Sequence, residues 1–346
     1  MLLYKLIRHW LRKRAARRAA ATEQPRAPQT RPERPRAGSA IGTPADPDAA
    51  ISVRGLRKTY DGNEAVRGVD FDVGRGEILA FLGPNGAGKT TCVEILEGFR
   101  GRSAGEVSVL GEDPARAPGE WRASIGVVLQ ESRPEPYLTT RECLELFAGY
   151  FPRPRPIDAT LELVGLAATA GTLANELSGG QQRRLDVALA LIGDPELVFL
   201  DEPTTGFDPV ARRSAWDVVA GLRELGKTIF LTTHYLEEAE FLADRIIVIA
   251  GGAIVAEGTP ATLGGRDRSA ARISFSLPTG IDGDRLPALF RADVLDGRVN
   301  HRTTEPLPDL RVLSAWATDT GIDLPDIEVR RPTLEEVYLE LIGAAA

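Results

Sequence analysis

A glycine-rich segment at residues 83–90 has the residue types and spacing that bind a phosphate chain. Its sequence, GPNGAGKT, fits the pattern G-x-x-x-x-G-K-[S/T] and lies between an apolar run and a helical pattern that extends through Phe99. The glycines let backbone N–H groups turn toward phosphate oxygens, and the helix dipole adds to this. Lys89 would reach the terminal phosphates, and the Thr90 hydroxyl would bind Mg²⁺. The alternative is a glycine-rich turn that matches by chance.

A second apolar run, residues 197–202 (LVFLDE), ends in two carboxylates. Asp201 is placed to hold Mg²⁺, and Glu202 is then available to orient or deprotonate an attacking water. A solvated strand end is the plain alternative. The pair carries more weight because a phosphate-binding segment lies upstream of it.

A third segment, LSGGQ at residues 177–181, precedes a helical run that extends to Ile192. It offers a serine hydroxyl and two glycine amides at a helix N-terminus, which is a second phosphate-binding device. One chain does not need two such devices for one nucleotide, whereas a second copy of the chain would need one to close over the terminal phosphate. Read alone, the pentapeptide could be only a helix N-cap followed by glycines.

Strand and helix patterns alternate between residues 51 and 265. Residues 69–73 alternate apolar and polar side chains, as a half-exposed strand does. Short apolar runs typical of buried strands occur at residues 77–82, 125–129, 197–200, 228–231 and 245–249. Helical stretches separate several of these runs. The pattern predicts an α/β domain with a mainly parallel sheet.

The two flanking regions differ from this middle part. Residues 1–21 read as a basic amphipathic helix, either a membrane-surface anchor or a frayed tail, and residues 22–50 are rich in Pro and Arg and are expected to be disordered. In the C-terminal part we expect a strand at 272–277, a helix at 310–320, and a helix at 333–341 that begins with a capping box.

Length and composition limit the function classes. A chain of 346 residues predicts about two domains. The net charge of −7 argues against general nucleic-acid binding, because binding to phosphates needs a basic surface. Two cysteines are too few for a disulfide framework or a zinc site and fit a reducing cytoplasm. No apolar run is long enough to span a membrane, so we expect that the chain does not cross one by itself.

The three motifs together resemble those of the ATP-binding cassette (ABC) ATPases, in unbroken order over about residues 51–265. The resemblance implies an α/β P-loop NTPase cassette with a mainly parallel core sheet, an antiparallel β subdomain and a helical signature subdomain. It also implies ATP and Mg²⁺ as ligands. Residues 1–50 would be a helix and linker, 51–265 the ATP-binding domain, and 266–346 a small α+β accessory domain.

Single positions also resemble the family's functional residues. Tyr60 matches the aromatic residue that stacks on adenine, Gln130 the glutamine that touches Mg²⁺ and faces the membrane partner, and His234 the histidine that senses the γ-phosphate. The D-loop is similar too, with Phe207 where leucine is commoner and Asp208 retained for contacts across a dimer. The plain alternatives are a strand-end tyrosine, a surface-loop glutamine and a structural histidine.

These matches define the expected site. Catalysis is assigned to Lys89, Glu202 and His234, and metal binding to Thr90, Gln130 and Asp201. The residues expected to bind ATP are Tyr60, Gly83, Pro84, Asn85, Gly86, Ala87, Gly88, Lys89, Thr90, Thr91, Ser178, Gly179, Gly180 and Gln181.

Within the family, residues 232–239 and 332–341 look like the bacterial drug- and polyketide-export ATPases of the ABC-2 group. That resemblance implies a homodimer, or a heterodimer with a related cassette, at the cytoplasmic face of the cell membrane. The dimer would power a separate transmembrane permease that exports a drug-like or lipophilic compound. An importer ATPase and a soluble ABC ATPase of the ribosome stay as alternatives, although the latter class carries two cassettes. Chromosome and DNA-repair ATPases need a long coiled coil, and residues 91–177 contain no heptads.

Overall fold

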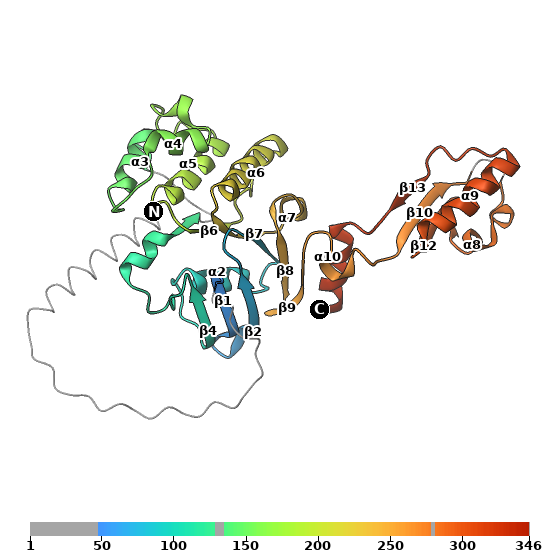
Figure 1. Cartoon of the computed structure of the whole chain (residues 1–346), viewed down its shortest axis with the longest axis horizontal. Coiled ribbons are helices and arrows are strands. Elements are labelled where there is room, and N and C mark those ends of the chain that lie inside the picture. The colour runs from blue at the N-terminus through green and yellow to red at the C-terminus, as the bar shows by residue number, and fades with distance from the viewer. Residues whose placement is uncertain (1–47, 129–134, 278–280, 346) are drawn as a thin grey trace, which may run out of the picture. The chain divides into compact units, whose positions relative to one another are not determined.

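The computed structural model describes residues 48–128, 135–277 and 281–345 (Figure 1). The expected N-terminal helix, most of the linker and Gln130 lie outside the described residues. The elements are β1 (Ile51–Tyr60), β2 (Asn63–Val73), β3 (Ile78–Leu82), α2 (Lys89–Leu96), β4 (Ala104–Val109), η1 (Gly119–Ser124), β5 (Ile125–Val128), α3 (Thr140–Ala148), α4 (Ile157–Leu163), η2 (Ala167–Thr169), α5 (Gly179–Leu191), β6 (Leu197–Asp201), α6 (Pro209–Glu224), β7 (Thr228–Thr233), α7 (Leu236–Leu242), β8 (Arg245–Ala250), β9 (Ala253–Gly258), η3 (Leu263–Gly265), β10 (Ala271–Ser276), η4 (Gly283–Arg285), α8 (Ala288–Arg291), β11 (Val294–Leu295), β12 (Arg298–Thr303), α9 (Pro306–Thr320), β13 (Glu328–Arg330) and α10 (Leu334–Ala345).

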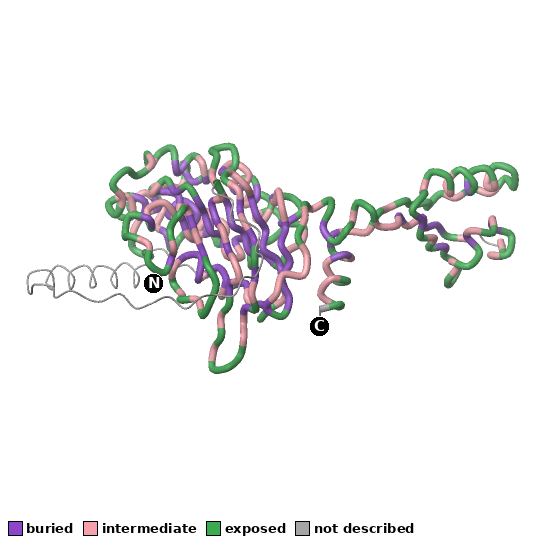
Figure 2. Tube along the Cα trace, turned by 60° about the horizontal axis from the view of Figure 1, so that its bottom comes forward, coloured by how far each residue is buried: buried purple, intermediate pink, exposed green. Residues whose placement is uncertain are grey.

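The chain forms two compact units that alternate along the sequence. Of the described residues, the first contains 48–56, Asp70–Gly76, 93–128 and 135–231, and the second contains Arg57–Val69, Glu77–Cys92, 232–277 and 281–345. Buried stretches, purple in Figure 2, alternate along the chain with exposed ones, and every residue of β3 and of β7 is buried. The domain boundaries expected from the sequence, at residues 50/51 and 265/266, stay a prediction.

Parallel strands in the first unit carry the carboxylate motif. β5 pairs in parallel with β6, from Ile125 opposite Leu197 to Val128 opposite Leu200, and β7 follows β6 in the strand order. The first four residues of β6 are buried, as their apolar sequence predicted. Since parallel strands need covering on both faces, such uninterrupted apolar runs belong in the interior of an α/β sheet.

The antiparallel part begins with a hairpin. β1 and β2 are joined by Asp61 and Gly62, which have φ angles of 45° and 86°. Positive φ at both central residues is the requirement of the type I′ turn that joins antiparallel strands. With β4, these strands form a three-stranded sheet in the order β2-β1-β4. The alternation predicted for residues 69–73 is confirmed, because Val69, Phe71 and Val73 are the buried side chains.

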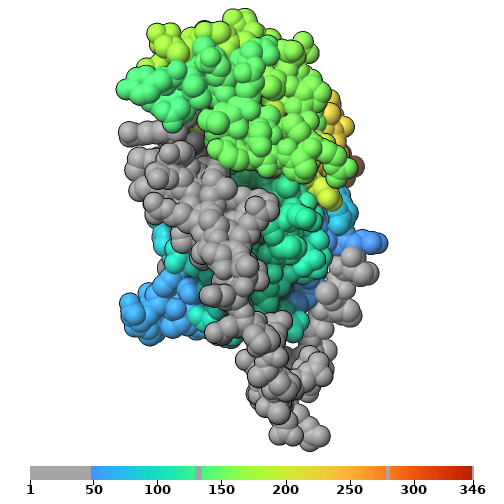
Figure 3. All heavy atoms as spheres, turned by 90° about the vertical axis from the view of Figure 1, so that its left-hand side faces the viewer, coloured from blue at the N-terminus to red at the C-terminus, as the bar shows by residue number. Residues whose placement is uncertain are grey.

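Three helices of the first unit, α3, α4 and α5, form the expected helical subdomain, and residues 140–191 make one continuous patch of surface (green in Figure 3). α3 begins with a capping box, in which Thr139 accepts from the N–H of Glu142 and the Glu142 carboxylate accepts from the N–H of Thr139. The hydrogen bonds that the Thr139 N–H and hydroxyl donate to the Glu142 carboxylate lower the pKa of Glu142. The capping box sets the start of the subdomain's first helix.

The second unit contains the strand that leads into the glycine-rich segment. β3 pairs in parallel with β8, from Leu79 opposite Arg245 to Leu82 opposite Val248, and β9 pairs antiparallel with β8. All five residues of β3 are buried. α2 follows β3, as expected.

The prediction that the α2 helical pattern extends to Phe99 is wrong. The helix ends at Leu96, and the side chain of Phe99 is 44% exposed. Gly98 has a φ of 76°, which is outside the helical region, so the chain turns away before Phe99 can reach the core.

A separate small sheet forms from residues 271–330 of the second unit. Its strand order is β11-β12-β10-β13, and the pairs are antiparallel. A cluster of buried side chains fills the face toward α8 and α9: Ile273, Phe275, Leu286, Phe290, Val299 and Leu313. The strand expected at 272–277 is confirmed, while the helix expected at 310–320 begins earlier, at Pro306, which is favoured in a first helical turn.

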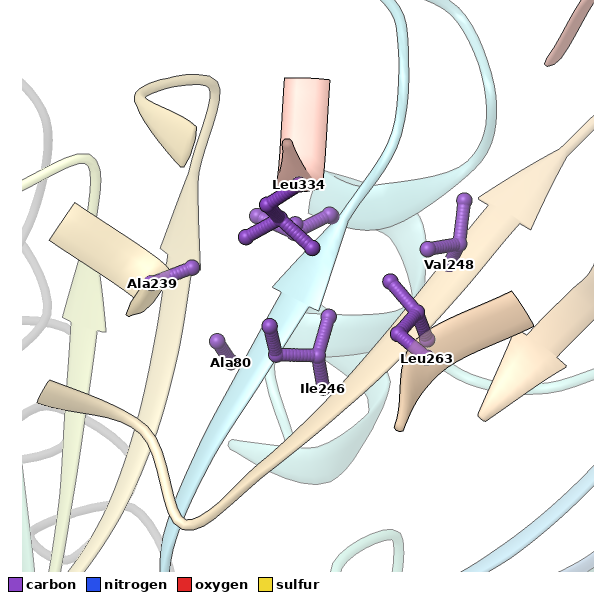
Figure 4. Close-up of a cluster of buried hydrophobic side chains, with 7 residues drawn as sticks. Ala80, Ala239, Ile246, Val248, Leu263 and Leu334 are labelled. Carbon is purple, nitrogen blue, oxygen red and sulfur yellow. The ribbon is translucent and has the colours of Figure 1, made fainter. Parts of the chain in front are cut away.

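The last helix, α10, packs on strands that come much earlier in the chain. Leu334 joins Ala80, Leu82, Ala239, Ile246, Val248 and Leu263 in one buried cluster (Figure 4). The expected capping box is confirmed, because the Glu336 N–H donates to Thr333 Oγ1 (3.2 Å) and the Thr333 N–H donates to Glu336 Oε2 (2.9 Å). α10 therefore covers β3 and β8.

Within residues 48–128, 135–277 and 281–345, no helix is long and apolar enough to cross a bilayer.

Candidate functional site

The loop between β3 and α2 can exist only with glycines at two of its positions. A Cβ on Gly83 would lie 2.3 Å from the carbonyl oxygen of Ile249, and one on Gly88 would lie 2.6 Å from that of Ala65. Gly88 also has a φ of 102°, and Gly86 a φ of 79°, where L side chains are rarely found. The glycines of the motif therefore serve close packing and backbone direction in the loop itself.

Lys89 begins α2 and lies across this loop. Its side chain is 7% exposed, and its Nζ donates to the carbonyl oxygens of Gly83 (2.7 Å) and Pro84 (3.2 Å). Thr90, the next residue, is exposed in the first turn of α2. A buried ammonium and an exposed hydroxyl thus flank the helix N-terminus, where the helix dipole favours anions.

The structure brings Tyr60 to the same loop. Its hydroxyl lies 3.5 Å from Thr91 Oγ1, and the Lys58 ammonium lies 5.0 Å from the centroid of its ring. Lys58 was not among the residues expected at the site. Its sequence signal was weak, namely a rare lysine two residues before Tyr60 and so on the same side of the strand.

His234 follows β7 and is exposed. Its ring lies 4.1 Å from that of Tyr235, centroid to centroid, and the N–H of Tyr235 donates to Thr233 Oγ1 at 3.0 Å. The turn after the strand therefore holds the imidazole at a strand end on the protein surface.

The carboxylate pair lies in the first unit. Asp201 ends β6 with a half-buried side chain, and Glu202 has a φ of 46°. The Glu202 carboxylate accepts a hydrogen bond from the Thr205 hydroxyl at 3.1 Å. A glutamate in this left-handed region is uncommon and indicates a backbone held in place by its surroundings.

A further carboxyl group, that of Glu97, is buried and interacts electrostatically with Asp201. It is 3% exposed, and burial raises its pKa well above the usual range, with smaller contributions from Asp201 and Glu94. Glu97 does not stand out in the sequence because it falls in an ordinary helical pattern. Burial therefore favours the protonated, uncharged form of Glu97, and the charge of Asp201 adds to this effect.

The signature segment forms a capped helix N-terminus. The Ser178 hydroxyl accepts from the N–H of Gln181 (3.3 Å), and the Gln181 side chain accepts from the N–H of Ser178 (2.9 Å). Ser178 and Gly179 are exposed. Since the Ser178 oxygen accepts in the cap, its O–H can donate outward. Two readings of this segment, an N-cap and an exposed anion site, are therefore compatible.

Asp208 has a local structural role. Its carboxylate caps α6 by accepting from the N–H groups of Val210 and Ala211, both at 2.9 Å. The expected site residues are divided between the two units. Tyr60 and the glycine loop belong to one unit, Asp201 and Glu202 belong to the other, and Gln130 lies outside the described residues.

Comparison with known proteins decides the family. A family model described as "ABC transporter" matches residues 66–205, and a second, for the C-terminal domain of ABC transporter domain-containing proteins, matches residues 271–333. A daunorubicin resistance ATP-binding protein of Streptomyces coeruleorubidus is 39% identical over 322 residues, which cover 86% of this chain and 96% of that protein. The chain belongs to the ABC transporter family.

Three further comparisons bear on this ABC ATPase. The Nod factor export ATP-binding protein I of Paraburkholderia xenovorans is 36% identical and covers 86% of this chain and 98% of its own. A dimeric ATP-binding cassette in a post-hydrolysis state with ADP and phosphate is 27% identical, with a TM-score of 0.55, over 60% of this chain and 98% of its own. The cbiO1 protein of Clostridium perfringens, part of an ABC transporter complex, is also 27% identical, with a TM-score of 0.57, over 62% and 90%.

The predicted fold is thereby confirmed for this ABC ATPase. Its strands and helices form the P-loop NTPase cassette, with parallel core strands, antiparallel sheets and a helical subdomain. ATP binding and hydrolysis follow from family membership. The roles of single site residues stay predictions.

Proposed function

We propose that this ABC ATPase powers the export of a drug-like or lipophilic compound through a separate membrane-spanning subunit. The observation that carries the proposal is the resemblance of nearly the full length of the chain to ATP-binding proteins named for daunorubicin resistance and for Nod factor export. The first name refers to drug resistance and the second to export. The match to the C-terminal domain model supports membership of the ABC transporter family in this part of the chain as well.

In this proposal the glycine loop holds the triphosphate of ATP. The loop N–H groups and the N-terminus of α2 face the phosphate oxygens, while Lys89 moves from the carbonyl oxygens of Gly83 and Pro84 to the terminal phosphates. Tyr60 stacks on adenine. The 3.5 Å approach of its hydroxyl to Thr91 supports this, because it places the ring beside the loop.

The residues present fit Mg²⁺. A threonine hydroxyl, an amide oxygen and a carboxylate, from Thr90, Gln130 and Asp201, are the oxygen donors that this ion prefers. In the described part of the chain no group of three or more His, Cys, Asp or Glu residues could hold a metal by itself. That fits an ion held largely by nucleotide phosphates and water. The bound ion would neutralise phosphate charge.

Glu202 is proposed to orient and deprotonate the attacking water, and His234 to contact the γ-phosphate. Glu202 follows β6 directly with a left-handed backbone, and the Thr205 hydroxyl donates to one oxygen of its carboxylate. A positioned base of this kind contributes about 10²- to 10⁴-fold to a rate.

We propose that two copies bind face to face, so that Ser178 of one copy closes over ATP held by Lys89 of the other. Ser178 and Gly179 are exposed at a capped helix N-terminus, which is an anion-binding geometry. The dimeric cassette among the similar structures supports this arrangement. Closure with ATP and release after hydrolysis would be the two states that a membrane subunit follows.

Cross-linking tests the dimer. Asn85→Cys and Glu176→Cys place thiols at exposed positions of the glycine loop and beside the signature segment. A short bifunctional maleimide should join two copies when ATP is present. The native Cys92 and Cys143 should not compete, because both are buried and burial raises their pKa values to about 12 and about 11.

Each single-cysteine protein serves as the control for this experiment, because neither should form the cross-link between the two loops. If the double variant never cross-links with ATP present, the shared-nucleotide dimer is rejected.

Co-purification tests the transport role. We propose that the chain lies on the cytoplasmic face of the membrane. When the affinity-tagged full-length chain is isolated from detergent-solubilised membranes of its native cell, a multi-helix membrane protein should co-purify with it. A periplasmic substrate-binding receptor in the same complex would favour the importer alternative. Recovery with ribosomes instead would contradict the transporter proposal.

A further inference from the structure

One buried arginine, Arg183, contacts the backbone on either side of Glu202. Its Nε donates to the carbonyl oxygen of Pro203 at 2.9 Å, and its Nη2 donates to those of Asp201 (3.0 Å) and Glu202 (3.3 Å). Arg183 is only 9% exposed, so its guanidinium is largely shielded from water. A single guanidinium thus accounts for hydrogen bonds to three successive carbonyl groups.

This backbone needs such a partner. Glu202 has a φ of 46°, which a glutamate rarely adopts, and the turn brings the negative ends of three neighbouring carbonyl dipoles to the same side. A planar cation with several N–H donors can satisfy all three at once, whereas a lysine ammonium is a compact point charge on a flexible stem. The guanidinium therefore stabilises the conformation that sets the direction of the Glu202 side chain.

The arginine is itself held firmly. It lies on α5, one and a half turns after the capped N-terminus at Ser178, and Asp186 lies one turn further along the same helix. The Asp186 carboxylate is 3.7 Å from Arg183 Nη1, and both side chains are buried. The carboxylate of Asp186 and the three carbonyl oxygens of the turn thus hold the guanidinium from two sides.

We propose that Arg183 is a positioning residue for ATP hydrolysis, which acts by holding the 201–203 turn so that the Glu202 carboxylate faces the attacking water. The inference rests on the proposed role of Glu202. It goes beyond that role because it assigns the geometry of the carboxylate to a residue on the signature helix that is not among the residues expected to bind ATP or Mg²⁺.

The test compares Arg183→Lys with the unchanged full-length protein. Its kcat should fall by about a hundredfold, because a misplacement of roughly 1 Å can cost that much. The nucleotide Kd should stay nearly the same when it is measured with a fluorescent ATP analogue under conditions that prevent hydrolysis. Arg184→Lys is the matched control, since the neighbouring Arg184 donates to the Ser214 hydroxyl on α6 and not to the turn. It should keep full activity.

A double variant separates positioning from general structure. In a Glu202→Gln protein, adding Arg183→Lys should cost almost nothing further in residual hydrolysis, because there is no longer a carboxylate to position. An additional hundredfold loss in the double variant would overturn the proposal, and so would an unchanged kcat in Arg183→Lys alone.

Folding is checked by ATP binding and circular dichroism. If Arg183→Lys does not fold, Arg183→Gln, which keeps an amide donor for the turn, takes its place with the same expectation. If neither variant folds, Arg183 is a folding determinant and the positioning role is rejected. Full activity of Glu202→Gln would instead reject the proposed role of Glu202, a result that does not depend on any Arg183 variant.

Discussion

The Glu202→Gln variant is expected to bind ATP, accumulate as a closed dimer and lose turnover by about 10²- to 10⁴-fold, the contribution of a positioned base. The amide has the shape of the carboxylate and can still accept from the Thr205 hydroxyl at its present 3.1 Å, so the turn should persist. The amide cannot take a proton from water. Phosphate release measures turnover, and size-exclusion chromatography with ATP measures the dimer.

Glu196→Gln is the matched control for this variant. Glu196 lies just before β6, at the end opposite Glu202, and forms an exposed ion pair with Arg75 at 2.8 Å. Such pairs contribute little, about 0–1 kcal/mol, so hydrolysis and stability should hardly change. Rapid steady-state hydrolysis by Glu202→Gln would count against the role assigned to this residue.

Lys89→Ala is expected to lower ATP affinity by about a hundredfold or more, because each charge-assisted hydrogen bond to a phosphate contributes about 1.5–3 kcal/mol. Its present hydrogen-bond acceptors are the carbonyl oxygens of Gly83 and Pro84. Both belong to the loop backbone, so the loop should fold without the amine. Isothermal titration calorimetry with ATP gives the affinity.

Thermal unfolding provides a second measurement for the same variant. ATP at a hundred times its Kd should stabilise the unchanged protein by about 2.7 kcal/mol and the Lys89→Ala protein hardly at all. Lys227→Ala is the control, since this lysine pairs with Asp194 at 2.8 Å and lies in the loop before β7. Normal ATP binding by Lys89→Ala would remove the argument for a phosphate cradle.

Local patterns predicted most of the fold. β3 and β6 are short apolar runs. Every residue of β3 is buried, as are all residues of β6 except the last, and this burial follows from composition alone. The capping box at Thr333 is a pattern of four adjacent residues, and it forms as expected. The end of α2 was misjudged because Phe99 keeps the helical period, although Gly98 before it leaves the helix.

Properties that depend on distant segments were not predictable in this way. Arg183 and Arg184 are adjacent arginines in the sequence, and only the position of the 201–203 turn makes the first a buried partner of three carbonyl groups. Glu97 likewise reads as a surface helix residue until folding removes its water. The apolar face of α10 could be read from its sequence, but not that it packs on β3 and β8.

That placement of α10 changes how the C-terminal region should be regarded. The chain leaves the ATP-binding strands after η3, builds the small sheet from β10 to β13, and then returns to cover Leu82 and Val248 with Leu334. The sheet is thus an insertion with two attachment points rather than an appendage at the end of the chain. A protein truncated after residue 265 would lack α10 and would expose the β3 and β8 side chains to water. Replacement of residues 271–330 by another small domain would keep α10 over these strands.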